Sequence, residues 1–239
     1  MDLPNLAVIP VDEPDLKLAC LDLTCLDGSE SLATRFLTDS ERDEFAALRH
    51  PGRRREWLGA RICLKVMLMQ SNQITHPSQC DVRKNGRGRP ALSFLPEVRT
   101  ADAVDCSLSH QGRYACAAIS SRPGVTIGVD IEPVTPRLAR LTPLFLSQHD
   151  TALHSRPHEM QLAVFWCLKE ACSKALGLGL GAGLSELVCV ETAAGRHQVT
   201  APDDSEFRAW HYHFRDHVVA LCRCLQGVPQ LPAALVAVV

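Results

Sequence analysis

The sequence predicts an α+β protein made of two similar, pseudo-symmetric lobes in one chain, residues 1–123 and 124–239. The chain matches itself at a constant shift of 109 residues, which indicates two copies of one unit. Each half runs in the same order of strand, short helix, long helix and closing strands. The closing strands follow one another directly, which favours antiparallel hairpins over repeated β-α-β units. Two copies are too few for a solenoid, so we expect two halves packed face to face.

The repeat covers about thirty residues around the first long helix without a gap. Its matched positions are Leu32 and Leu141, Phe36 and Phe145, Thr38 and Ser147, Glu41 and Asp150, Trp57 and Trp166, Cys63 and Cys172, and Lys65 and Lys174. A residue needed for packing should recur in both copies, whereas a residue needed for chemistry can occur in one. Glu170 stands out, because its counterpart in this comparison is Arg61.

The elements follow in order along each copy. Strands are expected at 17–24 and 125–132, long helices at 54–69 and 160–176, and closing strands at 114–120, 211–214 and 217–224. A short helix is expected after Thr38, where Glu41 completes a capping box, and a second after Ser147. Gly177 lies where the last long helix should end. The turn residues at 120–125 place the join between the lobes there.

Composition excludes several classes of protein. Hydrophobic residues make up 46% and charged residues 22%, as in ordinary globular proteins. The net charge of −2 gives no sign of a nucleic-acid partner. No apolar run approaches the roughly 20 residues that span a bilayer, and the N-terminus lacks the pattern of a signal peptide. We therefore expect a cytoplasmic protein with neither a nucleic-acid nor a membrane partner.

The 11 cysteines are scattered and include no C-x-x-C pair. This favours a reducing cytoplasm, cysteines used as small buried apolar residues, and no zinc site. His149, His154 and His158 do not share one helical face and should face solvent. The apolar tail at 231–239 is interpreted as an edge strand or a docked tail.

Three carboxylates form the candidate metal site. Asp130 and Glu132 lie two residues apart on an expected strand, so both point to one face. Glu170 lies in the middle of the second long helix, and its counterpart in the first copy is not a carboxylate. Oxygen ligands from a strand and a helix suit Mg²⁺. Alternatively, Asp130 and Glu132 form a solvated strand face, and Lys174 only pairs with Glu170 four residues earlier.

Two segments rich in arginine, at 50–57 and 84–92, offer candidate phosphate contacts. Either segment alone could be solvated surface. Ser109 and His110 end a strand before a turn at Gly112, where a lone histidine is more often structural. Taken with the carboxylates, these residues indicate a ligand that carries several phosphates together with Mg²⁺.

With these features the chain resembles a known family, the two-lobed 4′-phosphopantetheinyl transferases of the type that activates surfactin synthetase. The motifs that carry the resemblance occur in the family's order: FLTDSERDEFAALRHPGRRREWLGARICLK, GRGRPAL, SLSHQGRYACAAIS, IGVDIEP, FLSQHD and FWCLKEACSKALGLGL. The resemblance implies two α+β lobes with the active site between them. It also implies transfer of phosphopantetheine from coenzyme A to a serine of an apo acyl or peptidyl carrier protein, with release of 3′,5′-ADP.

The resemblance assigns roles by position. Asp130, Glu132 and Glu170 would hold Mg²⁺ on the pyrophosphate, and Glu170 would also help to deprotonate the acceptor serine. Lys174 would contact the pyrophosphate. The residues implied at the 3′-phosphate end of coenzyme A are Ser109, His110, Arg89 and one arginine among Arg53, Arg54 and Arg55, with Arg53 taken as the candidate.

Two positions depart from the family pattern and leave some expectations open. Ser107 stands where the family often has Asn, and Gln111 where it often has Ser, which affects contacts near the nucleotide. The alternative function is a non-catalytic module of the same fold that binds coenzyme A or a nucleotide. Because both lobes are in one chain, we expect a functional monomer with one active site. The class of carrier protein stays open.

Overall fold

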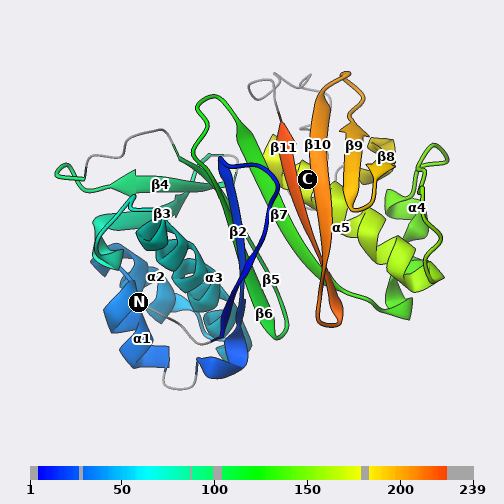
Figure 1. Cartoon of the computed structure of the whole chain (residues 1–239). Coiled ribbons are helices and arrows are strands. Elements are labelled where there is room, and N and C mark those ends of the chain that lie inside the picture. The colour runs from blue at the N-terminus through cyan, green and yellow to red at the C-terminus, as the bar shows by residue number, and fades with distance from the viewer. Residues whose placement is uncertain (1–4, 27–28, 87, 99–103, 179–182, 225–239) are drawn as a thin grey trace. The chain divides into compact units, whose positions relative to one another are not determined.

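A computed structural model describes residues 5–26, 29–86, 88–98, 104–178 and 183–224 (Figure 1). The chain divides into two compact units, Met1–Pro123 and Gly124–Val239. Each unit combines helices with an antiparallel sheet, so the α+β class is confirmed. Among the described residues, no helix has both the length and the apolar character needed to cross a membrane. The expected tail strand at 231–239 lies outside the described residues.

The N-terminal unit contains a four-stranded sheet in the order β1-β2-β6-β5 and a two-stranded sheet, β3-β4. Its strands are β1 Leu6–Ile9, β2 Leu16–Asp22, β3 Cys80–Lys84, β4 Pro90–Phe94, β5 Asp105–Gln111 and β6 Tyr114–Ser120. Its helices are η1 Leu23–Cys25, α1 Ser29–Phe36, α2 Asp39–Ala47, α3 Pro51–Gln70 and η2 Pro77–Gln79. The long helix α3 buries its apolar side in a core that includes Leu64, Leu21 and Ala117.

The C-terminal unit contains a five-stranded sheet in the order β7-β11-β10-β9-β8. Its strands are β7 Thr126–Pro133, β8 Val188–Ala193, β9 Arg196–Thr200, β10 Glu206–Phe214 and β11 His217–Cys224. Its helices are η3 Pro136–Arg140, α4 Thr142–Phe145, α5 His158–Leu176 and η4 Leu184–Glu186. The long helix α5 ends as expected, because Gly177 adopts a left-handed conformation that favours glycine.

One of the two expected short helices forms and the other does not. The capping box is confirmed: the Thr38 hydroxyl accepts from the Glu41 amide at 3.2 Å, and the Thr38 amide donates to the Glu41 carboxylate at 3.0 Å. After Ser147 the chain turns instead, so the expected helix there is wrong. Asp150 accepts from the amides of both Ser147 and Cys189, which draws the chain toward β8 rather than into a helix.

The uninterrupted shift of 109 residues is also wrong beyond Asp150. The ammonium of Lys65 binds the Phe36 carbonyl and Glu41, and in the C-terminal unit the lysine that binds the Phe145 carbonyl and Asp150 is Lys169. The shift between these lysines is 104 residues, because the connection before α5 is shorter. Lys174 is therefore not the counterpart of Lys65, and Arg61 is not the counterpart of Glu170.

The cysteines are mostly buried, as expected, but one pair differs from the expectation. Cys20 and Cys116 lie directly opposite each other in the β2–β6 register and form a disulfide. Among the described residues, eight further cysteines are buried and form no disulfide. The register explains the pair, because directly opposed residues of antiparallel strands bring their side chains within bonding reach. His149, His154 and His158 are exposed, as the sequence predicted.

Candidate metal and active site

The candidate metal ligands of the C-terminal unit are placed by one strand and one helix. Asp130 and Glu132 alternate along β7 with Val129 and Ile131, and the last two are buried. Gly128 lies on the same face as Asp130 and Glu132, and that face meets α5, where Glu170 is buried. The alternation predicted from the sequence thus brings the strand carboxylates toward the helix.

A glycine makes the close contact between β7 and α5 possible. A Cβ atom built on Gly128 would lie 1.8 Å from the carbonyl oxygen of Ala171 and 2.8 Å from the amide nitrogen of Ala175. Both atoms belong to the backbone of α5, so no side-chain rotation could relieve the overlap. Only glycine permits this approach. The contact lies one residue from Glu170 and one residue from Lys174, so it sets how closely both reach the strand.

Lys174 and Trp166 of α5 bind the two strand carboxylates. The Lys174 ammonium donates to Asp130 Oδ1 at 2.7 Å and to the Val129 carbonyl at 3.0 Å. The Trp166 indole donates to Glu132 Oε1 at 3.3 Å. These contacts orient both carboxylates from the same helix. The solvated strand face considered as an alternative does not describe Asp130, which is only 4% exposed.

Glu170 has a strongly perturbed acidity. Burial removes its carboxylate from water and raises its pKa to about 7, and the negative charges of Asp130 and Glu132 add to this rise. The Lys174 ammonium acts in the opposite direction. Three carboxylates thus influence one another with one lysine among them. A divalent cation would relieve this repulsion, and the all-oxygen donor set fits Mg²⁺.

The residues expected to bind the nucleotide lie in the N-terminal unit. Ser109 and His110 are neighbours on β5, and adjacent residues of a strand point to opposite faces. Ser109 is buried, and His110 Nδ1 lies 3.3 Å from a carboxylate oxygen of Glu56 on α3. The two side chains therefore do not converge on one face of this sheet, although the resemblance groups them.

The arginines differ in how far their own unit already engages them. Arg89 is buried and forms an ion pair of 2.7 Å with Asp105. Arg54 donates to the carbonyls of Phe45 and Leu48, and its guanidinium lies 4.0 Å from the centre of the Phe45 ring. Arg53 and Arg55 are exposed. Arg54 has a structural role, so Arg53 and Arg55 are the better candidates for a phosphate contact.

Sequence reasoning missed three residues that shape the site. Gly128 allows the close contact, and a glycine inside a predicted strand is the signal that could have indicated it. Trp166 recurs in both copies when they are compared without a gap, which predicts a packing residue, but its indole also donates to Glu132. Lys169, fully buried on α5, binds the Phe145 carbonyl and Asp150. The sequence feature that could have indicated this buried contact is a lysine among the apolar residues of the helix.

A second group with metal-binding side chains consists of Glu191, His197 and His211, all buried. The Glu191 carboxylate already forms an ion pair with Arg156 and accepts the amide of Leu153. His197 Nε2 and His211 Nδ1 lie 2.7 Å apart, which is a hydrogen bond. The neighbouring guanidinium and the bonded imidazoles make this group a buried hydrogen-bond network. Its position on β8, β9 and β10 separates it from the carboxylates of β7.

Comparison with known proteins finds similarity to one superfamily. The family model described as the 4′-phosphopantetheinyl transferase superfamily matches residues 126–222. A 4′-phosphopantetheinyl transferase of Bacillus pumilus is 33% identical over 122 residues, which cover 49% of this chain and 48% of that protein. A putative 4′-phosphopantetheinyl transferase of Synechocystis sp. is 24% identical over 204 residues, which cover 83% of this chain and 78% of that protein. The chain thus spans about half the length of the first relative.

Among solved structures, a holo-(acyl-carrier-protein) synthase of Bacillus anthracis in complex with CoA (3′,5′-ADP) is similar at 22% identity, with a TM-score of 0.39. The match covers 47% of this chain and 96% of that chain. The family match spans β7, α5 and most of β11, and so contains Asp130, Glu132, Glu170 and Lys174. The superfamily indicated by the sequence motifs is confirmed over residues 126–222.

Proposed function

We propose that this chain, whose residues 126–222 belong to the 4′-phosphopantetheinyl transferase superfamily, transfers phosphopantetheine from coenzyme A to a serine of an apo carrier protein. The carrier is of the acyl or peptidyl class, and the second product is 3′,5′-ADP. The observation that carries the proposal is the meeting of Asp130, Glu132, Glu170 and Lys174 between β7 and α5. The part of the proposal that concerns the rest of the chain and its partners rests on the resemblance.

The metal part of the proposal rests on the donor set. Asp130, Glu132 and Glu170 would hold Mg²⁺, which prefers carboxylate oxygen and leaves positions for phosphate. The bound ion supplies positive charge for the pyrophosphate of coenzyme A. The surroundings of Glu170 support this assignment: burial raises its pKa, the negative charges of Asp130 and Glu132 add to the rise, and a bound cation would offset both.

In the proposed reaction, the serine hydroxyl oxygen bonds to the β-phosphorus of coenzyme A and the bond from that phosphorus to 3′,5′-ADP breaks. Glu170 takes the serine proton as the general base. Lys174 offsets the negative charge that develops on the pyrophosphate. Arg53, Arg89, Ser109 and His110 are proposed for the 3′-phosphate end.

Glu170→Gln tests the proposal, because it keeps the size of the side chain and removes its charge. We expect turnover to fall about 10²-fold or more, as for the loss of a general base. Coenzyme A should still bind, since its 3′-phosphate end is assigned to the other unit. The matched control is Glu159→Gln, which changes an exposed glutamate in the first turn of the same helix.

The assay is mass spectrometry of apo carriers incubated with coenzyme A and Mg²⁺, with binding followed by calorimetry. Near-normal turnover by Glu170→Gln would show that the assigned base is wrong. Binding of coenzyme A by the wild-type chain without transfer to acyl or peptidyl carriers would instead support the alternative of a non-catalytic binding module. The same panel of carriers addresses which class is used.

A further inference from the structure

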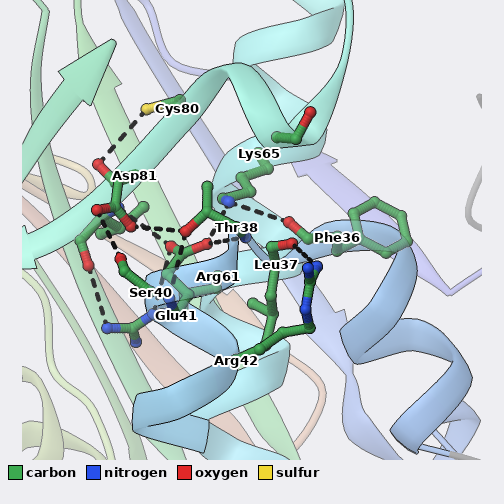
Figure 2. Close-up of polar contacts among 12 residues, drawn as sticks. Phe36, Leu37, Thr38, Ser40, Glu41, Arg42, Arg61, Lys65, Cys80 and Asp81 are labelled. Atoms are coloured by element: carbon green, nitrogen blue, oxygen red, sulfur yellow. Dashed lines mark hydrogen bonds and ion pairs between the residues drawn. The ribbon is translucent and has the colours of Figure 1, made fainter. Parts of the chain in front are cut away.

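The N-terminal unit contains a buried network centred on Lys65, shown in Figure 2. The Lys65 ammonium donates to the Phe36 carbonyl at 2.9 Å and forms an ion pair with Glu41. Glu41 also accepts the amides of Thr38 and of Val82, each at 3.0 Å. Because the side chains of Lys65 and Glu41 are 0% and 1% exposed, the network joins α3 to the start of α2 and to β3 without solvent.

The C-terminal unit contains the same network built from other residues. The Lys169 ammonium donates to the Phe145 carbonyl and to Asp150, each at 2.7 Å. Asp150 also accepts the amides of Ser147 and of Cys189, each at 2.8 Å. The lysine and the carboxylate are again 0% and 1% exposed. Each unit thus uses one helix lysine, one phenylalanine carbonyl, one carboxylate and two backbone amides in the same bonding pattern.

The two networks differ in the residue that comes directly after the lysine on the helix. Val66, after Lys65, is a buried apolar residue of α3. Glu170, after Lys169, is the proposed metal ligand and base. The N-terminal network is therefore a control for the C-terminal one, since it shares these bonds and this burial but has Val66 where the C-terminal unit has Glu170. Glu41 forms one additional ion pair, with Arg61 at 3.6 Å.

Helix geometry explains how the C-terminal network acts on the site. Successive residues of an α-helix are about 100° apart around the axis. Lys169 is fixed by Phe145 and Asp150 on one side, and Ala171 is fixed against Gly128 about 200° further around. Glu170 falls between these two fixed points, at about 100° from each. The two contacts together determine the rotation of α5 and so the direction in which Glu170 points.

We propose that Lys169 is a positioning residue: through Phe145 and Asp150 it fixes the rotation of α5 that directs Glu170 toward Asp130 and Glu132. This inference rests on the proposed function. Lys169 itself is buried among its own partners and is assigned no contact with substrate. A displacement of about 1 Å at a catalytic group can cost about 10²-fold in rate, so a small rotation of α5 would matter.

The test compares two double variants that remove both charges of one network. Lys169→Met with Asp150→Asn changes the C-terminal network, and Lys65→Met with Glu41→Gln changes the N-terminal one. Each variant is measured for its urea midpoint, for Mn²⁺ binding by electron paramagnetic resonance, and for transfer to an apo carrier at saturating coenzyme A and metal. Mn²⁺ serves as the probe because it accepts the same oxygen ligands as Mg²⁺.

We expect the C-terminal variant to bind Mn²⁺ at least about 10-fold more weakly, as for loss of a group that orients metal ligands. Its turnover should fall about 10²-fold. The N-terminal variant should lose at least as much in urea midpoint, because Glu41→Gln also weakens the ion pair of Glu41 with Arg61, while Mn²⁺ affinity and turnover change less than about threefold. Equal losses of Mn²⁺ affinity and turnover in the two variants, or native Mn²⁺ affinity and turnover in the C-terminal one, would overturn the inference.

Two further outcomes are separated by design. If the C-terminal double variant does not fold, Asp150→Asn alone replaces it, because this change keeps Lys169 and its bond to the Phe145 carbonyl. Native Mn²⁺ affinity and turnover in that single variant would also overturn the inference. If the wild-type chain neither binds Mn²⁺ nor modifies any carrier, the proposed function fails, and the role of Lys169 fails with it for that separate reason.

Discussion

The contact between Gly128 and α5 yields the sharpest prediction, because the structure gives its size. In Gly128→Ala, the new Cβ would start 1.8 Å from the Ala171 carbonyl oxygen and must reach at least 3.0 Å. The obstacle is helix backbone, so α5 has to move away from β7 by more than about 1 Å, at the cost of core packing. We expect the free energy of unfolding to fall by about 1–3 kcal/mol and turnover to fall about 10²-fold.

Gly59→Ala is the matched control for this prediction. Its Cβ would lie 2.1 Å from Leu23 Cδ2, the end of a flexible side chain that can rotate away. Alanine also favours the helix by about 1 kcal/mol over glycine, which offsets part of the cost. Urea unfolding and the carrier assay are run on both variants. Wild-type turnover in Gly128→Ala, or an equal loss in Gly59→Ala, would refute the argument that this close approach positions the acidic residues.

Three more predictions concern charge. Without divalent cation, stability should decrease by about 3 kcal/mol as pH rises from 4.5 to 7, because the folded pKa of Glu170 is raised to about 7; Glu170→Gln should remove this slope in urea unfolding. Burial lowers the pKa of His197 to about 4 and of His211 to about 3, so unfolding experiments should show stability decreasing as pH falls below about 6.5, and a flat profile would contradict this. Arg54→Ala should lower the free energy of unfolding by about 1–2 kcal/mol and leave the affinity for coenzyme A unchanged. Arg53→Ala should leave the stability unchanged and weaken the binding of coenzyme A measured by calorimetry.

Much of the site could be predicted because strand alternation is a local rule. Asp130 and Glu132 share a face whatever the surroundings, and the motif placed Glu170 on a helix. The capping box at Thr38 likewise depends only on neighbours in sequence. These features need no knowledge of the loops that connect them.

The remaining features depend on contacts between residues far apart in the chain. The amide of Cys189, on β8, binds Asp150 and draws the chain away from the helix expected after Ser147. The comparison of the two halves without a gap paired Lys65 with Lys174, because one shortened connection shifts every later position. The disulfide of Cys20 and Cys116 follows from strand register, which composition does not reveal.

The duplicated lysine network also shows where the chain accepts a change in length. Glu41 and Lys65 are 24 residues apart, and Asp150 and Lys169 are 19 apart, yet each pair forms the same bond. Each bond fixes both ends of the segment between the carboxylate and the lysine, so the length of that segment can vary. In the C-terminal unit the connection includes His154 and Ser155, which are exposed. A fluorescent or affinity tag inserted between them would therefore lie in a connection whose two ends are fixed by the bond between Asp150 and Lys169. The protein could be labelled there without displacing α5.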